Sequence, residues 1–267
     1  QNFGTMTKPL HPGLAARAGV VAADLASRGF TADEAIIDAP MGFVHLFSPG
    51  QDGDPNAIPE LGRPWDIVDP GISVKKYPCC FVTHNALDAI LDLKAEAGFS
   101  AGDVAAVEVH MPEGSAAPLI HPRPRTGLEG KFSMPYAMAA ALLDGQPVLS
   151  TFEDEAVQRP EAQELLRRCD LVFDPLQGEL LAAYADVVVK LRDGRTLSKR
   201  SERPRGGPDA PLSREELAIK YRDCARRVLS AEDAERSLTM VESLEDLSDI
   251  RELMSLLCRT SVPAAAG

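Results

Sequence analysis

Residues 48–70 constrain the fold of this chain more than any other stretch. They read SPGQDGDPNAIPELGRPWDIVDP, a run rich in proline, glycine and aspartate without periodic apolar residues. Proline removes a backbone donor and glycine costs conformational entropy in a regular element, so such a run is unsuited to a helix or a central strand. We therefore predict a linker loop at 48–70, with separate structural units before and after it.

The segment before the linker is predicted to be helical. Residues 14–28 (LAARAGVVAADLASR) place apolar side chains at helical spacing, and Gly29 stands where a C-cap glycine is expected. Thr31 is a suitable N-cap residue, so we expect a second helix from there toward Phe47 in spite of Pro40. Residues 1–47 are therefore expected to belong to a helical unit.

Strand and helix patterns are mixed after the linker. The strongest hairpin signal is Asp193-Gly194, inside the β-rich run 184–202. Because the regular strand-helix alternation of a doubly wound sheet is missing, we predict an α+β fold with a small antiparallel sheet over 71–205, followed by C-terminal helices over 206–267. The expected elements are a strand at 71–77, a helix at 78–97, a strand at 104–111, a helix at 126–144, the hairpin, and two or three amphipathic helices at 213–259 that open with a Ser213–Glu216 capping box.

The charge balance restricts the partners of the protein. Forty acidic against 28 basic side chains give a net charge of -12, which argues against nucleic acid or an anionic membrane as the main partner. No apolar run approaches the roughly 18 residues of a membrane helix, and QNFGTMTKPLH lacks the features of a signal peptide. Five cysteines, an odd number without framework spacing, fit a reducing compartment, so we expect a cytoplasmic protein.

The segment KKYPCCFVTH, residues 75–84, gathers basic and titratable side chains in this acidic chain. Proline is favoured at the first helical position, so Pro78 predicts that Cys79 and Cys80 lie in a first turn whose free N–H groups stabilise a thiolate. His84, four residues after Cys80, is then a candidate acid or base on the same helix face. Lys75 and Lys76 precede the helix and point to opposite faces, so one of them reaches the helix start as part of an anion site.

A structural interpretation of this segment stays open beside the functional one. Buried cysteines are commonly small core residues, and a histidine on a helix is commonly a hydrogen-bonded core residue. Metal binding is not expected, because the chain has no C-x-x-C or H-E-x-x-H pattern.

Two further clusters combine basic and polar side chains near helix starts. In TMTKPLHPG, residues 5–13, Lys8 and His11 bracket a proline and are a second candidate anion site; the alternative is a solvated lysine and a capping histidine. In RTGLEGKFSMPYA, residues 125–137, the glycine and serine positions of a phosphate loop are missing, which leaves Lys131 as a cation and Tyr136 as either a proton donor or a packed aromatic residue.

Three segments in order, GTMTKPLHPGLAAR, KKYPCCFVTHNALDAI and LEGKFSMPYAMAAALLDG, resemble the signature segments of the MmgE/PrpD family. This family includes 2-methylcitrate dehydratases, cis-aconitate decarboxylases and iminodisuccinate epimerases. The resemblance implies a large helical domain followed by a smaller α+β lid, a homodimer, and proton-transfer chemistry next to a carboxylate of a small di- or tricarboxylate, without a metal or an iron-sulfur cluster. It implies that residues 1–47 are the end of the helical domain and that the C-terminal helices pack back on it.

The resemblance also assigns roles to single residues. Lys8 matches the lysine of the T-K-P-L-H segment, and Tyr136 matches the active-site tyrosine of the third segment. Lys75 matches a lysine that precedes, by five residues, a catalytic-site histidine of the decarboxylase branch; Cys80 stands at the histidine position, which fits epimerisation or elimination better than decarboxylation. We therefore expect Lys75, Cys80, His84 and Tyr136 to be catalytic, and Lys8, His11, Lys76 and Lys131 to bind substrate.

The resemblance further implies a helical region upstream of residue 1 that contributes to the same pocket. Two interpretations follow. The first is a lyase, of the hydro-lyase type, or an epimerase, similar to 2-methylcitrate dehydratase. The second is a truncated, non-catalytic lid or oligomerisation module that pairs with itself or with a longer relative. A thiol redox protein is disfavoured, because a disulfide between adjacent cysteines is strained.

Overall fold

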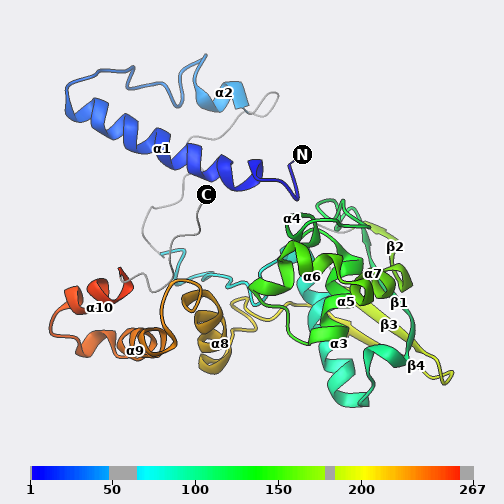
Figure 1. The fold of residues 1–267 in the computed structure, drawn as a ribbon. Helices are drawn as coiled ribbons and strands as arrows, with labels where there is room; N and C mark the ends of the chain where they lie inside the picture. Colours follow the sequence, from blue (N-terminus) through cyan, green and yellow to red (C-terminus); the bar gives the residue numbers. More distant parts are fainter. Residues whose placement is uncertain (1, 48–64, 178–183, 259–267) are drawn as a thin grey trace. The chain divides into compact units, whose positions relative to one another are not determined.

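The computed structural model describes residues 2–47, 65–177 and 184–258. The chain divides into two compact units, one comprising Met6–Ile72 and the other Ser73–Gly267 with Phe3–Thr5 (Figure 1). No helix in the described ranges is both long and apolar enough to cross a membrane.

The first unit is built around one long helix, α1, which spans Thr7–Ser27. It begins earlier than the apolar pattern predicts and takes up the T-K-P-L-H segment, while Gly29 follows its C-cap with a positive φ of 86°, as the sequence predicts. The second helix predicted from Thr31 is wrong over most of its length, since only α2, Phe43–Phe47, is helical there. Pro40 lacks the N–H that a continuous helix needs, and the preceding residues form turns instead.

The second unit contains a four-stranded sheet of order β2-β1-β3-β4. The hairpin predicted around Asp193-Gly194 is confirmed and consists of β3 and β4, which pair antiparallel. β1 pairs antiparallel with β3 but parallel with β2, a strand that the sequence analysis missed. The α+β class is confirmed, but the sheet is mixed. The strands are β1 Val104–Glu113, β2 Cys169–Gln177, β3 Ala185–Leu191 and β4 Thr196–Ser201.

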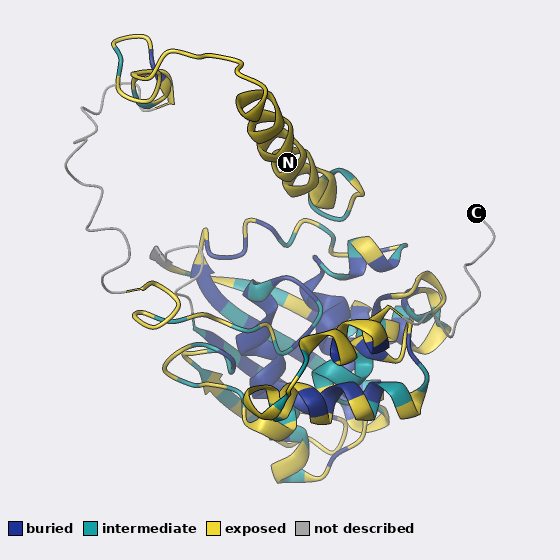
Figure 2. Ribbon diagram, turned by 90° about the vertical axis from the view of Figure 1, so that its left-hand side faces the viewer, coloured by how far each residue is buried: buried dark blue, intermediate teal, exposed yellow. Residues whose placement is uncertain are grey.

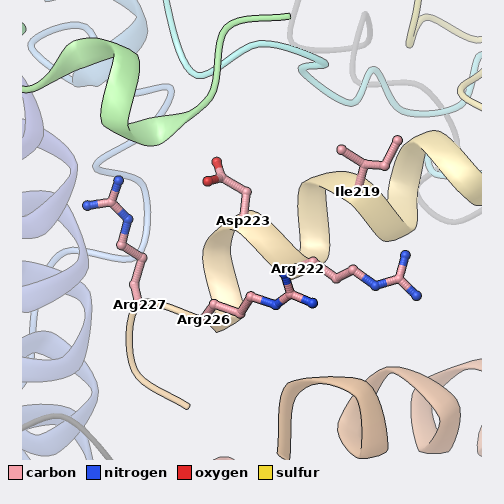
Figure 3. A pocket seen from close by; sticks show the side chains of 5 residues that line it. All are labelled: Ile219, Arg222, Asp223, Arg226 and Arg227. Atoms are coloured by element: carbon pink, nitrogen blue, oxygen red, sulfur yellow. The ribbon is translucent and has the colours of Figure 1, made fainter. Parts of the chain in front are cut away.

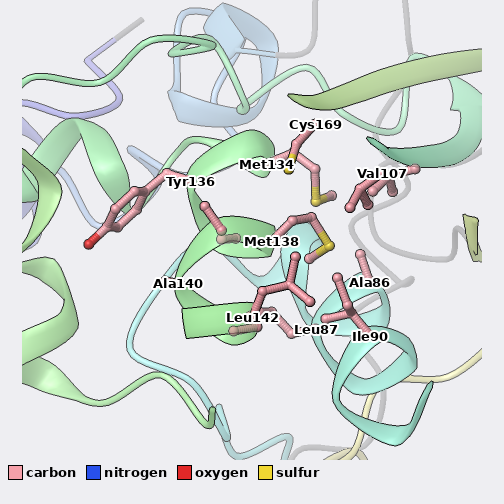
Figure 4. Packing of buried hydrophobic residues seen from close by; sticks show 14 of the residues in the cluster. Ala86, Leu87, Ile90, Val107, Met134, Tyr136, Met138, Ala140, Leu142 and Cys169 are labelled. Atoms are coloured by element: carbon pink, nitrogen blue, oxygen red, sulfur yellow. The ribbon is translucent and has the colours of Figure 1, made fainter. Parts of the chain in front are cut away.

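Two helices, α3 (His84–Ala97) and α5 (Met134–Asp144), pack against one face of this sheet. The strands alternate accordingly: Val107 and Val109 of β1 are fully buried, whereas Glu108 between them is half-buried. Figure 2 shows this buried layer between the sheet and the helices, and Figure 4 shows its packing around Met138 and Ile90. The core of the second unit therefore lies on one side of the sheet.

Short helical segments connect the strands and the main helices. The predicted helix at 126–144 is interrupted, since α4 ends at Gly130 and Ser133 caps a new start by accepting from the N–H of Tyr136. The segments are η2 Phe81–Thr83, η3 Ala101–Asp103, α4 Gly127–Gly130, η4 Leu149–Phe152, α6 Asp154–Gln158, α7 Pro160–Leu165 and η5 Leu166–Arg168.

Three helices follow the sheet, as the sequence predicts. They are α8 Arg214–Ala225, α9 Ala231–Glu242 and α10 Ile250–Leu257, with η6 Leu244–Asp246 before the last. The Ser213–Glu216 capping box at the start of α8 is confirmed by both of its hydrogen bonds. Helices α9 and α10 share a small apolar cluster of Met240, Leu253 and Leu256.

Candidate active site around residues 75–84

The segment before α3 is neither the strand nor the helix that its sequence predicts. Residues 71–77 make no strand, and Pro78 does not begin a helix: Cys80 is extended, η2 follows, and α3 begins at His84. Backbone hydrogen bonds fold residues 75–80 into a turn-rich loop, the 75–80 loop. Cys79 N–H donates to Tyr77 O (2.9 Å) and Cys80 N–H donates to Lys131 O (2.9 Å).

Both cysteines of this loop are buried, and they precede the helical run, with Cys80 as the N-cap of η2, rather than lying in a first turn as predicted. The Cys79 thiol lies 3.2 Å from the Thr83 hydroxyl. Burial raises the pKa of Cys79 to about 12, against smaller opposing effects that include those of Lys75 and Lys131. The expectation of a stabilised thiolate is therefore wrong for Cys79, which is a neutral thiol, while the catalytic role of Cys80 stays a prediction.

Lysine side chains from three elements approach the 75–80 loop. The Lys75 ammonium donates to Cys79 O (3.0 Å), so its side chain folds back over its own loop. Lys131, which follows α4, is held beside the loop by the bond between its carbonyl and Cys80. Lys220 of α8 donates to Lys75 O (2.6 Å). The structure thus brings the predicted residues Lys75 and Lys131 together with Lys220, which the sequence analysis did not identify.

Lys76 has a different partner from Lys75 and is engaged in an ion pair, while the opposite directions predicted for the two side chains stay a prediction. Its ammonium lies 2.7 Å from a carboxylate oxygen of Glu216, and its side chain is 8% exposed. The ion pair with Lys76 and the hydrogen bond from the Ser213 N–H hold the pKa of the Glu216 carboxyl below its usual range. A substrate carboxylate at Lys76 would have to displace Glu216.

His84 is a fully buried histidine without a hydrogen-bond partner for either ring nitrogen in the described part of the chain. Its ring packs on those of Tyr77 and Phe81, with centroids 5.1 Å away in each case. Burial, reinforced by the charge of Lys75, lowers the pKa of His84 to about 3, although the nearby backbone of Tyr77 and Cys79 opposes the shift. His84 is therefore neutral at physiological pH, with unused capacity to donate and to accept one hydrogen bond.

Tyr136 of α5 is fully buried, and its hydroxyl donates to Thr151 O at 2.5 Å. Figure 4 shows its ring on the other side of α5 from Met138. Burial raises the pKa of Tyr136 to about 12, and Arg159 opposes this shift. The hydroxyl is thus a protonated donor already bound to backbone, and its predicted catalytic role is untested.

Lys8 and His11 lie on α1, in the other compact unit, and both are exposed. They are helical residues rather than members of the rigid loop that the sequence predicts, and Pro12 lies inside the helix. Their predicted roles in substrate binding stay predictions.

The sequence analysis missed residues that contact the 75–80 loop directly but lie far from it in the sequence. Asp88 of α3 accepts from the Tyr77 hydroxyl (2.7 Å) and from Arg205 N–H (2.9 Å). Glu216 was identified only as a capping residue, although it also pairs with Lys76, 140 positions earlier. Periodicity carries no signal for such pairs, because they join elements far apart in sequence.

A second cluster of charges, at the C-terminal end of α8, is largely neutralised. Figure 3 shows a surface hollow of about 410 Å³ lined by Ile219, Arg222, Asp223, Arg226 and Arg227. Arg222 and Arg226 share Glu235, and Arg227 pairs with Glu153. No group of three or more histidine, cysteine, aspartate or glutamate side chains suited to a metal ion occurs among the described residues.

Comparison with known proteins gives relatives of one kind. A cis-aconitate decarboxylase of Mus musculus is 31% identical over 269 residues, and that of Homo sapiens is 30% identical over 272 residues. A cis-aconitate decarboxylase of Aspergillus terreus is 28% identical over 277 residues. These matches cover 96–99% of this chain but only 54–56% of the relatives, so the chain spans about half the length of the curated relatives it matches.

Two family models match in the order that the resemblance implies. The model of the MmgE/PrpD N-terminal domain matches residues 1–56, and that of the MmgE/PrpD C-terminal domain matches residues 77–246. The second match includes most of the 75–80 loop, the whole sheet, α8 and α9. The chain belongs to the MmgE/PrpD family.

Proposed function

We propose that the protein is part of a lyase that acts on a small polycarboxylate, with the 75–80 loop as one wall of the active site. The observation that carries the proposal is that Lys75 and Lys131 lie at this loop, whose backbone Lys220 holds, in a chain of net charge -12. A local group of ammonium ions in an acidic protein attracts a di- or tricarboxylate and disfavours most other ligands.

The same ammonium groups suit the chemistry of this family. Removal of a proton or of CO₂ next to a carboxylate leaves an electron pair on carbon that spreads toward the carboxylate oxygens. Fixed cations beside those oxygens stabilise this charge more in the transition state than in the bound acid. We assign this role to Lys75, with Lys131 as a second cation beside the same loop.

Proton transfer needs a neutral donor or acceptor next to these cations. His84 is neutral and has both ring nitrogens unpaired in the described part of the chain, so an approaching carboxylate would favour its protonated form. Cys80 and Tyr136 are the other candidates for returning a proton to carbon. Our proposal therefore keeps Lys75, Cys80, His84 and Tyr136 as catalytic candidates.

The type of lyase or epimerase reaction is a finer proposal. The matched relatives are cis-aconitate decarboxylases, which favours an unsaturated tricarboxylate as ligand. Cys80, at the position where the decarboxylase branch has histidine, favours elimination or epimerisation instead. The product of a whole protein given cis-aconitate or 2-methylcitrate distinguishes them, because proton NMR separates a decarboxylated acid, a hydrated or dehydrated acid, and the other diastereomer of 2-methylcitrate.

The first test is binding, because it can be measured on this chain. We expect cis-aconitate, citrate or 2-methylcitrate at millimolar concentration to raise the melting temperature of the wild type by mass action. Lys75→Met should reduce the shift, whereas Lys190→Met should keep it in full, since Lys190 is an exposed lysine on β3 that pairs with Glu108. The proposal fails if none of the acids shifts the wild type, or if both variants respond alike.

A second candidate function is association through the first unit, and one observation favours it. Helix α1 has no buried residue, although Leu10, Leu14, Val21 and Leu25 lie along one face of it. Apolar stripes of this kind commonly bind another protein surface. We propose a homodimer, or pairing with a longer relative, as its use. Light scattering of the wild type and of Leu14→Glu tests this, and a monomeric wild type would contradict the homodimer.

A further inference from the structure

Helix α8 contacts two adjacent residues of the 75–80 loop, Lys75 and Lys76. The Lys220 ammonium donates to Lys75 O at 2.6 Å, and Glu216, one turn earlier on the helix, holds the Lys76 ammonium at 2.7 Å. Residues 216 and 220 are four apart, so they lie on the same face of α8. One helix face therefore fixes both the carbonyl of Lys75 and the side chain of Lys76.

The loop is also held on its other sides by groups outside α8. Val74 N–H donates to Gly206 O at 2.7 Å, and Cys80 N–H donates to Lys131 O at 2.9 Å. The Tyr77 hydroxyl is bound to Asp88. The backbone on both sides of Lys75 is thus held by hydrogen bonds, and the Lys75 ammonium donates to Cys79 O, within the same loop.

We propose that Lys220 is a positioning residue for Lys75, in that its bond to Lys75 O sets the direction in which the Lys75 ammonium is presented to a carboxylate ligand. This role rests on the proposed function of the 75–80 loop as an acid-binding wall. It deepens that function by making Lys220, 145 positions after Lys75, part of the site.

An ammonium group is well suited to the hydrogen bond between Lys220 and the carbonyl of Lys75. A charged donor to a carbonyl makes a shorter and stronger bond than a neutral donor, and an ammonium has two further protons for other acceptors. A methionine of similar length would fill the space without the donor. Arginine would keep both the donor and the charge. The pair Lys220→Met and Lys220→Arg therefore separates the hydrogen bond from the packing of the side chain.

The first arm of the experiment needs no ligand. Amide hydrogen exchange is measured in the whole chain for the wild type, Lys220→Met, Lys220→Arg and the control Lys190→Met. Lys220→Met should speed exchange at the Cys80 amide about tenfold, and the other two variants should exchange like the wild type. Unchanged exchange in Lys220→Met, with a wild-type circular dichroism spectrum, overturns the proposal.

The second arm is a double-mutant cycle on binding of cis-aconitate, measured by calorimetry. Lys220→Met should weaken binding about tenfold in the wild type but not further in a Lys75→Met background, because Lys220 acts through Lys75. Lys220→Arg should restore most of the affinity. An equal loss in both backgrounds shows that Lys220 acts on the ligand by itself and overturns the proposal. If the wild type binds neither cis-aconitate nor citrate, the proposed function fails, while the exchange arm still decides whether Lys220 holds the loop.

Discussion

His84 predicts a specific sensitivity of the folded protein to acid. Its pKa is about 3 in the folded protein but about 6.5 when the imidazole is exposed, as in the unfolded chain. Below pH 6.5 the unfolded chain binds a proton at this residue and the folded chain does not. The neutral, buried imidazole therefore leaves stability intact above pH 6.5 and lowers it progressively as the pH falls toward 3.

The size of this effect follows from the two pKa values. Each pH unit between them costs about 1.4 kcal/mol of unfolding free energy, so lowering the pH from 7 to 4 should cost about 3 kcal/mol through His84 alone. In His84→Leu this contribution is absent, and only the losses from other groups remain. The wild type should thus lose about 3 kcal/mol more than His84→Leu over the same pH interval.

Urea denaturation at several pH values, followed by far-ultraviolet circular dichroism, measures this difference. The control is Thr83→Val, a neighbouring buried substitution without a titratable group; it removes bonds to Cys79 and Cys80 but should keep the full acid slope of the wild type. Parallel stability curves for the wild type and His84→Leu would refute the assignment of a buried, neutral imidazole, whatever their absolute stabilities.

Three further predictions concern the packing around the site. Asp88→Ala should destabilise the protein by about 3 kcal/mol, because it leaves the buried Tyr77 hydroxyl without its acceptor, and Tyr77→Phe should cost about half as much; denaturant titrations of both check this. In native protein two thiols should react quickly with a thiol reagent and three only on unfolding, since two cysteines are exposed and three are buried. Gly127→Ala should impair folding, because a Cβ there would lie 1.8 Å from Phe152 O, whereas Gly19→Ala in open space on α1 should be neutral or raise the melting temperature.

The sequence predicts well where a signal is local. The Asp193-Gly194 turn, the Ser213–Glu216 capping box and the C-cap at Gly29 all depend on neighbouring residues, and all three are present. It fails at β2, because Cys169–Gln177 has no clean alternation and becomes a strand through parallel pairing with β1, about 60 residues earlier in the chain. Propensity cannot show a pairing that only the tertiary fold supplies.

The prediction that a helix begins at Pro78 is wrong for a different reason. The rule that favours proline at the first helical position is correct, but an extended residue and a 3₁₀ turn come before the helix here. The Cys80 amide, which a helix start would leave unpaired, instead donates to Lys131 O. The same bond that displaces the helix start brings Lys131 to the loop. The displaced helix start and the position of Lys131 beside the loop therefore have one cause.

The titrating groups at this loop make its charge independent of pH near neutrality. Burial raises the pKa of the Cys79 thiol and lowers that of the His84 imidazole, so both groups are neutral between about pH 5 and pH 10. The fixed charges are then those of the lysines, of which Lys76 is compensated by Glu216. A polycarboxylate bound at the loop, as proposed, would meet lysine ammonium groups near a neutral imidazole. Such a separation of fixed charge from titratable group suits a site that binds an anion and then moves a proton next to it, because binding the anion does not consume the proton donor.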